Sequence, residues 1–150
     1  MIARARAYTG AMPRALLLCA LLAFAACSAV AQPSAAEAQA IRAVVSSQIE
    51  AFGRDDGEAA FALATDAIRE RFGTPQEFLR MVRTGYPVVY RPRSLRFEPP
   101  VAIDGGIVQP VRMTDTEGRA WLALYTMQRR PDGAWRIDGC ALSRLAAQET

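Results

Sequence analysis

Residues Arg119 to Leu142 read RAWLALYTMQRRPDGAWRIDGCAL, and this stretch predicts two long, largely apolar β-strands joined by a turn at Pro131-Asp132-Gly133. Proline presets φ at the first turn position, aspartate bonds back to its own backbone, and glycine accepts a positive φ. A two-stranded hairpin is barely stable alone in water. We therefore expect this hairpin to form one wall of a core that other elements cover.

Further β segments precede the hairpin. After Tyr86 valine, tyrosine, phenylalanine and isoleucine become frequent, and proline or glycine breaks occur at strand spacing. The predicted segments are 95–97, 101–103 and 107–113, separated by Pro99-Pro100 and by Asp104-Gly105-Gly106. Together with the hairpin they indicate a sheet of about four main antiparallel strands.

Three helical segments are predicted before the β half. Ser34 and Glu37 form a capping box for the first, which has Gly53 as its end cap and one apolar stripe, namely Ile41, Val44, Val45, Ile49 and Phe52. The second covers 58–72, with a break near Thr65-Asp66. The third has Pro75 as its first residue after Thr74, and we expect helices to stop at Gly85.

The order of these elements predicts the fold class. Helices followed by a run of strands are typical of an α+β domain, in which the sheet buries one face against the helices. We expect N-terminal helices packed on a curved antiparallel sheet of about four strands. Residues 32–150 form this single domain, with a core at about 41–142, and no repeat or second domain boundary is visible.

Residues 1–31 resemble an export signal. Arg4, Arg6 and Arg14 give a charged start, Ala15 to Ala26 is apolar, and Ala29-Val30-Ala31 supplies the small residues that signal peptidase recognises. The apolar run is too short to span a bilayer as a folded helix. We expect a periplasmic or secreted protein that begins at Gln32.

Lipid attachment is the alternative processing route. Residues 22–27 read LAFAAC and resemble a bacterial lipobox in the small residues before Cys27. They differ from it at Phe24, where an aliphatic residue is usual. If this route is used, Cys27 carries the lipid and the protein is anchored in the envelope. Contact with a membrane is expected only in that case.

Composition excludes several classes of function. Without Arg4, Arg6 and Arg14 the chain keeps 15 basic and 15 acidic residues, so a basic nucleic-acid-binding surface is not indicated. Histidine and lysine are absent, which removes histidine bases, Schiff-base lysines and histidine metal ligands. Cys140 is the only cysteine after the leader, so neither an internal disulfide nor a thiolate metal cluster can form. We expect no metal and no cofactor.

Asp138 is the first candidate for acid-base chemistry, because it interrupts an apolar strand, where burial would raise its pKa. An even hairpin loop places Tyr125 opposite Asp138, and an odd loop reverses the facing of these side chains. The alternative is that Asp138 lies on a solvated face. Cys140 lacks a histidine or lysine to activate it, so it is interpreted as a core residue.

The segment from Tyr86 to Ser94 is the candidate for ligand binding. Tyr86, Tyr90, Arg91 and Arg93 combine hydroxyl groups with planar guanidinium groups that can hold a carboxylate or phosphate. We expect this loop at the mouth of the cavity between sheet and helices. In the alternative interpretation the tyrosines close that mouth and the arginines pair with Glu77 or Glu98. Trp121 and Trp135 are predicted to be core or interface residues.

Four stretches carry a resemblance to a known family. They are Gly85 to Ser94, Asp56-Gly57 with Ala59 to Phe61, Ile68-Arg69 with Arg71 to Gly73, and Asp132 to Cys140. Over about 41–142 they closely resemble bacterial exported proteins grouped as domain of unknown function 4864. More loosely, the helix order and the last strand are similar to the nuclear-transport-factor-2-like superfamily, a cone of curved sheet around helices. Many enzymes of that superfamily pair a histidine with an aspartate, and this chain has no histidine.

The resemblance implies a fold and no activity, because that superfamily contains both enzymes and binding modules. We interpret the chain as a non-enzymatic module that binds a small molecule or an envelope protein; a homodimer is compatible with this. One alternative is an enzyme that uses Asp138 with Tyr125 or Tyr90 on a small apolar substrate. Another is a structural envelope subunit. An open pocket holding Asp138 and a tyrosine would favour the enzyme, and a closed core there the structural role.

Overall fold

The computed structural model describes residues 31–146 and has the predicted α+β architecture. Five helices precede five strands in these residues. Their bounds are α1 Ala35–Gly53, α2 Gly57–Ala62, α3 Asp66–Phe72, α4 Pro75–Gly85, α5 Pro87–Tyr90, β1 Ser94–Phe97, β2 Val101–Ile103, β3 Gly106–Thr114, β4 Ala120–Arg129 and β5 Trp135–Arg144. The charged start, the apolar run and the lipobox with Cys27 lie outside the described residues.

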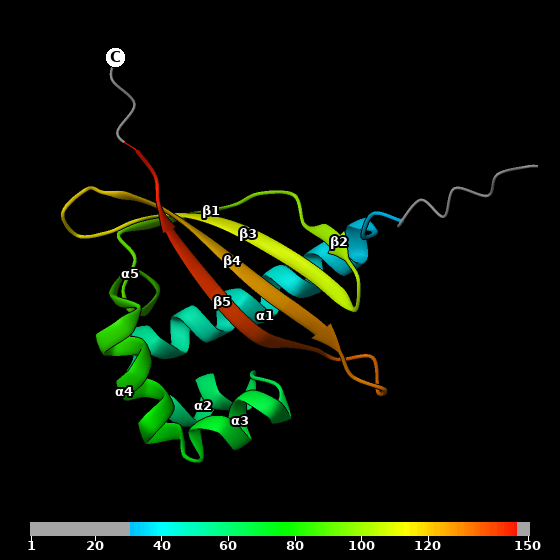
Figure 1. The fold of residues 1–150 in the computed structure, drawn as a ribbon, viewed down its shortest axis with the longest axis horizontal. Helices are drawn as coiled ribbons and strands as arrows, with labels where there is room; N and C mark the ends of the chain where they lie inside the picture. Colours follow the sequence, from blue (N-terminus) through cyan, green and yellow to red (C-terminus); the bar gives the residue numbers. More distant parts are fainter. Residues whose placement is uncertain (1–30, 147–150) are drawn as a thin grey trace, which may run out of the picture.

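The strands form one antiparallel sheet in the order β1-β3-β4-β5, with β2 also paired to β3. β1 and β2 occupy successive halves of the same edge of β3, because β1 pairs with residues 111–114 and β2 with 106–108. The sheet is therefore four rows wide although it has five strands. Figure 1 shows the long strands crossing over α1, with α2, α3 and α4 grouped beyond β5.

Local capping signals set most of the helix boundaries. Ser34 and Glu37 form the predicted capping box of α1, and Thr74 caps α4 with Pro75 at its first position. The break near Thr65 is confirmed, because the Thr65 hydroxyl accepts a hydrogen bond from the backbone N–H of Ile68 and starts α3.

Two details of the helical half differ from the prediction. Helices do not stop at Gly85, because the short helix α5 follows. It begins at Pro87, whose fixed φ suits the first position of a helix. The left-handed residue after α1 is Asp55, at φ 57°, and Gly53 ends the helix in an ordinary conformation. Aspartate tolerates this region better than most residues.

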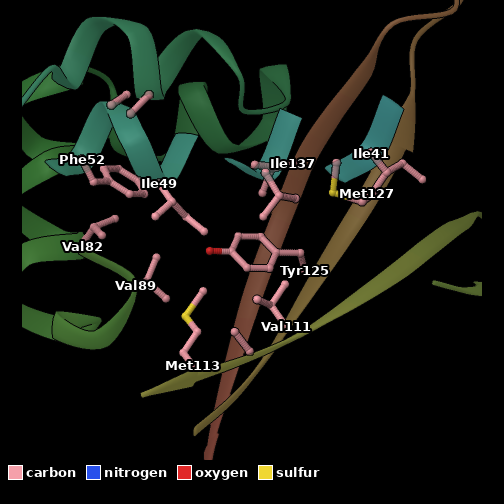
Figure 2. Packing of buried hydrophobic residues seen from close by; sticks show 14 of the residues in the cluster. Ile41, Ile49, Phe52, Val82, Val89, Val111, Met113, Tyr125, Met127 and Ile137 are labelled. Atoms are coloured by element: carbon pink, nitrogen blue, oxygen red, sulfur yellow. The ribbon is translucent and has the colours of Figure 1, made fainter. Parts of the chain in front are cut away.

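The core lies between the inner face of the sheet and the helices. β3 and β4 alternate between buried and less buried positions, as expected for a sheet covered on one face. Trp135 is buried and Trp121 half-buried, so the hairpin is part of this core. Figure 2 labels some of its central side chains, Ile41, Ile49, Phe52, Val111, Met113, Tyr125, Met127 and Ile137.

The hairpin turn forms as predicted, and the register of its strands changes between the turn and the far end of the hairpin. Gly133 has φ 87°, and the Asp132 carboxylate accepts a hydrogen bond from the backbone N–H of Ala134. Near the turn Met127 pairs with Ile137, whereas beyond a β-bulge Tyr125 pairs with Cys140. The Met127–Ile137 pair is the one that an odd loop gives. Beyond the bulge the pairing follows neither simple loop length, because the bulge inserts one extra residue, Asp138, into β5.

The link between α2 and α3 holds the bulge in place. The backbone N–H of Ile137 donates to the carbonyl of Leu63, and the backbone N–H of Thr65 donates to the carbonyl of Ile137, both at 2.9 Å. The free edge of β5 is therefore paired with the residues before α3. This contact fixes Asp138 beside the first turn of that helix.

Candidate functional site

A cavity of about 400 Å³ lies between β4 and β5 of the sheet and the helices α1, α3 and α4. Its wall is mostly apolar, and its volume is within the range of sites for small molecules. Three aromatic rings define one side, since the Phe78 ring centroid lies 5.9 Å from that of Phe52 and 5.6 Å from that of Phe72. Met81, Val82, Val89 and Ile137 complete the apolar surface.

Tyr125 supplies the most buried polar group of the cavity. Its side chain is 0% exposed, and its hydroxyl has no hydrogen-bond partner in the described part of the chain. Figure 2 shows the hydroxyl pointing away from the sheet, toward the helices that carry Ile49, Phe52 and Val89. Burial raises the pKa of Tyr125 well above its usual value, and the nearby Cys140 thiol, a weak hydrogen-bonding group that lies outside bonding geometry, adds to this effect. The phenol therefore stays protonated and serves as a hydrogen-bond donor.

Cys140 lies opposite Tyr125 on β5 and lines the same cavity. Burial raises the pKa of its thiol to about 12. Because the thiolate is the reactive form, this cysteine is a poor nucleophile near neutral pH. Its assignment to the core rather than to catalysis agrees with this geometry.

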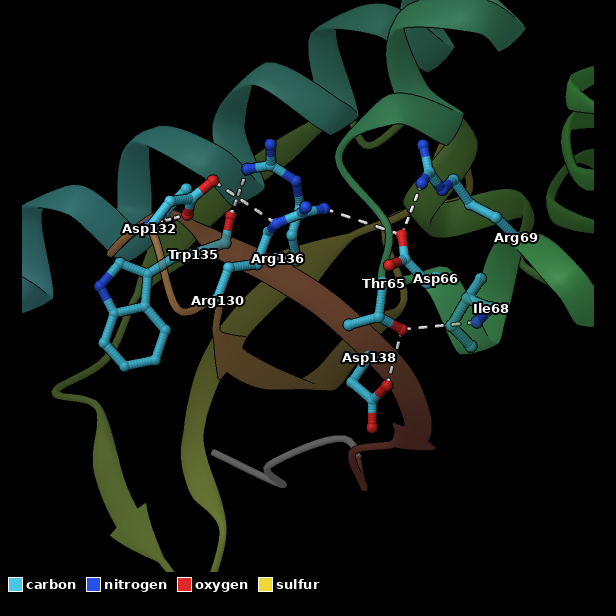
Figure 3. A network of polar contacts seen from close by, with 10 residues as sticks. Thr65, Asp66, Ile68, Arg69, Arg130, Asp132, Trp135, Arg136 and Asp138 are labelled. Carbon is cyan, nitrogen blue, oxygen red and sulfur yellow. Dashed lines mark hydrogen bonds and ion pairs between the residues drawn. The ribbon is translucent and has the colours of Figure 1, made fainter.

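Asp138 also lines the cavity, and both of its carboxylate oxygens accept hydrogen bonds from side chains. Thr65 Oγ1 donates to one oxygen at 2.7 Å, and Gln128 Nε2 donates to the other at 2.9 Å. Figure 3 shows the first contact at the start of α3, where Thr65 also caps the helix. Asp138 and Tyr125 thus share a cavity, although they do not face each other as the simple even register expected.

The Tyr86 to Ser94 segment is only partly at this cavity. Tyr86 lines it, together with Val89, whereas Tyr90, Arg91 and Arg93 do not. The Tyr90 hydroxyl donates to Asp55, and the guanidinium groups of Arg83 and Arg91 lie 3.0 and 3.1 Å from the Asp55 carboxylate. Arg91 therefore pairs with Asp55, and not with Glu77 or Glu98.

Asp55 joins the turn after α1 to the segment that follows α4. The guanidinium groups of Arg83 and Arg91 also lie 5.3 and 4.8 Å from the centroid of the Tyr90 ring, within the range of cation–π contacts. Hydrogen bonds from Tyr90 and Arg83 lower the pKa of Asp55. This network holds the segment around Tyr86 against the turn after α1. The ligand-binding role of Tyr90, Arg91 and Arg93 stays a prediction.

The sequence pattern of a known family matches residues 34–150. This chain belongs to domain of unknown function DUF4864. No curated protein and no solved structure matches the chain. The DUF4864 match spans every described helix and strand, so the cavity belongs to the family domain and not to an appended segment.

Arg71 is a cavity residue of this DUF4864 domain that the sequence interpretation missed. It lies in the last turn of α3, its guanidinium carbon is 5.7 Å from the centroid of the Phe72 ring, and it has no carboxylate partner within residues 31–146. The spacing of Ile68, Arg71 and Phe72, at i, i+3 and i+4, places all three on one helix face. That spacing was the available signal.

Gln48 is a second missed residue. It is buried on α1, and its side-chain amide donates to the carbonyl of Ala60 at 3.1 Å. This bond ties α1 to α2 behind the cavity. Its spacing from Val45 and Phe52 places it on the buried face of α1, but a single buried glutamine has no pattern that distinguishes it from a surface residue.

Residues 31–146 hold no cluster of three or more carboxylates or thiols that could bind a metal ion. None of the helices built from these residues is long and apolar enough to cross a membrane. The groups available for chemistry in the DUF4864 cavity are the side chains of two tyrosines, a carboxylate, a guanidinium, an amide and a protonated thiol.

Proposed function

We propose that this DUF4864 protein binds a small, largely apolar molecule in the cavity between the sheet and the helices. The observation that carries the proposal is the unpartnered Tyr125 hydroxyl on a mostly apolar wall. A buried hydroxyl without a partner costs about 1–3 kcal/mol. A ligand that accepts a hydrogen bond would remove this cost, whereas a purely structural core would do better with phenylalanine.

The shape of the domain supports the same function. A curved antiparallel sheet over helices is compatible with the nuclear-transport-factor-2-like cone, and in such an architecture the space between sheet and helices is where a small ligand fits. We extend the proposal to that superfamily on this architectural ground alone. The cavity beside Asp138 also argues against the structural envelope subunit, for which a closed core was expected there.

The proposed binding takes place outside the cytoplasm. The arginine-flanked apolar run and Ala29-Val30-Ala31 support removal of a leader and release of a chain that begins at Gln32. Lipid attachment at Cys27 remains the alternative route. Either route would place the ligand cavity in the periplasm or beyond it.

An enzyme is the second candidate, because Asp138 and Tyr125 line one cavity. Two features favour binding over proton transfer. Both Asp138 oxygens already accept hydrogen bonds, and the raised pKa of Tyr125 keeps its proton on the phenol. Deuterium uptake at the α-carbon of a small apolar ketone, present in wild type and lost in Asp138→Asn, would instead establish the enzyme.

The binding proposal is tested with the neutral fluorescent dye N-phenyl-1-naphthylamine. Ile68 lines the cavity and is half-buried, so Ile68→Trp should fill the space and abolish the rise in dye fluorescence. Ala67 is the preceding residue, is exposed and does not line the cavity, so Ala67→Trp is the matched control. Equal dye binding by both variants and wild type would contradict a cavity site.

A further inference from the structure

Some polar groups of the cavity already have hydrogen-bond partners within the protein, and others do not. Gln48 donates to a backbone carbonyl, and Asp138 accepts hydrogen bonds on both oxygens. Within residues 31–146 the Tyr125 hydroxyl is the buried oxygen of this cavity that has no hydrogen-bond partner, and Arg71 is the cavity's guanidinium and has no carboxylate partner; the half-buried Tyr86 also lines the cavity. A ligand that fits this cavity should satisfy the Tyr125 hydroxyl and Arg71.

The Tyr125 group calls for an uncharged oxygen acceptor. Its hydroxyl is fully buried, and its raised pKa keeps it a donor. Placing a charged group beside it would require removing that charge from water among apolar side chains, which is far more costly than placing a carbonyl or ether oxygen there. The ligand atom next to Tyr125 should therefore be an uncharged oxygen that accepts a hydrogen bond and belongs to an otherwise apolar molecule.

Arg71 calls for an anion at the other end. It is exposed, so a carboxylate can reach its guanidinium while keeping part of its own hydration. Charge-assisted bonds between guanidinium and carboxylate are the strong class of hydrogen bond, and the planar fork of arginine matches a carboxylate.

The position of Asp138 gives the ligand a direction. Asp138 is held at Thr65, the N-cap of α3, whereas Arg71 lies in the last turn of the same helix. Six residues of helix correspond to a rise of about 9 Å. The protein's own carboxylate and its guanidinium are thus at opposite ends of α3, so an anionic head at Arg71 is kept away from Asp138.

Between these ends the wall is apolar. Ile68 lies on the same helix face as Arg71, and Phe72 and Phe78 continue the surface with ring centroids 5.6 Å apart. We infer, on the basis of the proposed binding function, that the ligand is an apolar monocarboxylic acid whose body carries one uncharged oxygen acceptor. The carboxylate binds Arg71, the hydrocarbon covers the aromatic wall, and the neutral oxygen accepts from Tyr125.

Displacement of N-phenyl-1-naphthylamine from the full mature protein tests the head group. Decanoate should displace the dye at a concentration about tenfold lower than its neutral ester, methyl decanoate, because only the acid pairs with Arg71. Arg71→Gln should abolish this preference. Arg144→Gln, which removes an exposed arginine of β5 outside the cavity, should keep it.

A series of oxodecanoates with the ketone at successive carbons tests the neutral acceptor. At least one should displace the dye about fivefold better than decanoate, and Tyr125→Phe should remove that gain. Tyr90→Phe is the matched control, because the Tyr90 hydroxyl binds Asp55 and lies outside the cavity. Melting curves of every variant establish that each one is folded.

The outcomes separate the two levels of the proposal. If acid and ester displace the dye equally, or if Arg71→Gln leaves the preference intact, the inferred head group is wrong while dye binding still supports a ligand cavity. If no oxodecanoate displaces the dye better than decanoate does, the inferred uncharged oxygen acceptor is wrong. If the dye fails to bind, or binds equally to Ile68→Trp, the proposed function itself fails.

Discussion

Tyr125→Phe should make the ligand-free protein more stable, which is unusual for a substitution in a core. The side chain is 0% exposed, and its hydroxyl has no partner among the described residues. Phenylalanine keeps the ring and its contacts and removes only the buried hydroxyl. Leaving such a group unpaired costs about 1–3 kcal/mol, so the free energy of unfolding should rise by about that amount. For a domain of roughly 100 residues, each kcal/mol raises Tm by about 3–6 °C.

The measurement is urea unfolding of delipidated, refolded protein, followed by tryptophan fluorescence and circular dichroism. Tyr90→Phe makes the same chemical change at a hydroxyl that donates to Asp55, so it should lower Tm. The two substitutions should therefore change Tm in opposite directions: Tyr125→Phe should raise it and Tyr90→Phe should lower it. A Tyr125→Phe protein less stable than wild type would show that the hydroxyl is paired in solution, and the argument for an unsatisfied binding group would be refuted.

Other parts of the structure give further predictions. Asp115 accepts hydrogen bonds from Trp121 and Arg119; burial alone would raise its pKa, but these bonds hold that pKa below its usual 3.8. Its ionised form therefore stabilises the fold above that pH and ceases to do so as the pH falls, so Asp115→Asn should lower Tm at neutral pH and flatten the acid branch of a plot of Tm against pH; parallel curves would contradict this. Trp135→Ala should cost about 3–5 kcal/mol in urea unfolding and Trp121→Ala less, because only Trp135 is buried; equal losses would argue against this difference. N-terminal sequencing of the native protein should give Gln32, or lipidated Cys27, and an intact Met1 on envelope-located protein would rule out both routes.

The sequence by itself determined the features that depend on neighbours along the chain. The capping box of Ser34 and Glu37, the start of α4 at Pro75 and the turn at Gly133 each follow from hydrogen bonds or φ preferences within a few residues. Alternation of apolar residues in the hairpin likewise predicted strands, and the order of helices and strands predicted an α+β fold. Such signals act before any tertiary contact forms, so they can be interpreted from the chain alone.

Only the tertiary structure decided the composition of the candidate site. The bulge that places Asp138 beside Thr65 depends on pairing between β5 and a segment 73 residues earlier in the chain. The pairing of Arg91 with Asp55 joins residues 36 positions apart in the chain. Helical spacing places Arg71 on one face with Ile68, but only the packing of α3 shows that this face lines a cavity. A single inserted residue in a strand changes which side chains face the core. The whole fold therefore decides which way these side chains point and which groups they bind, because both depend on contacts between residues far apart in sequence.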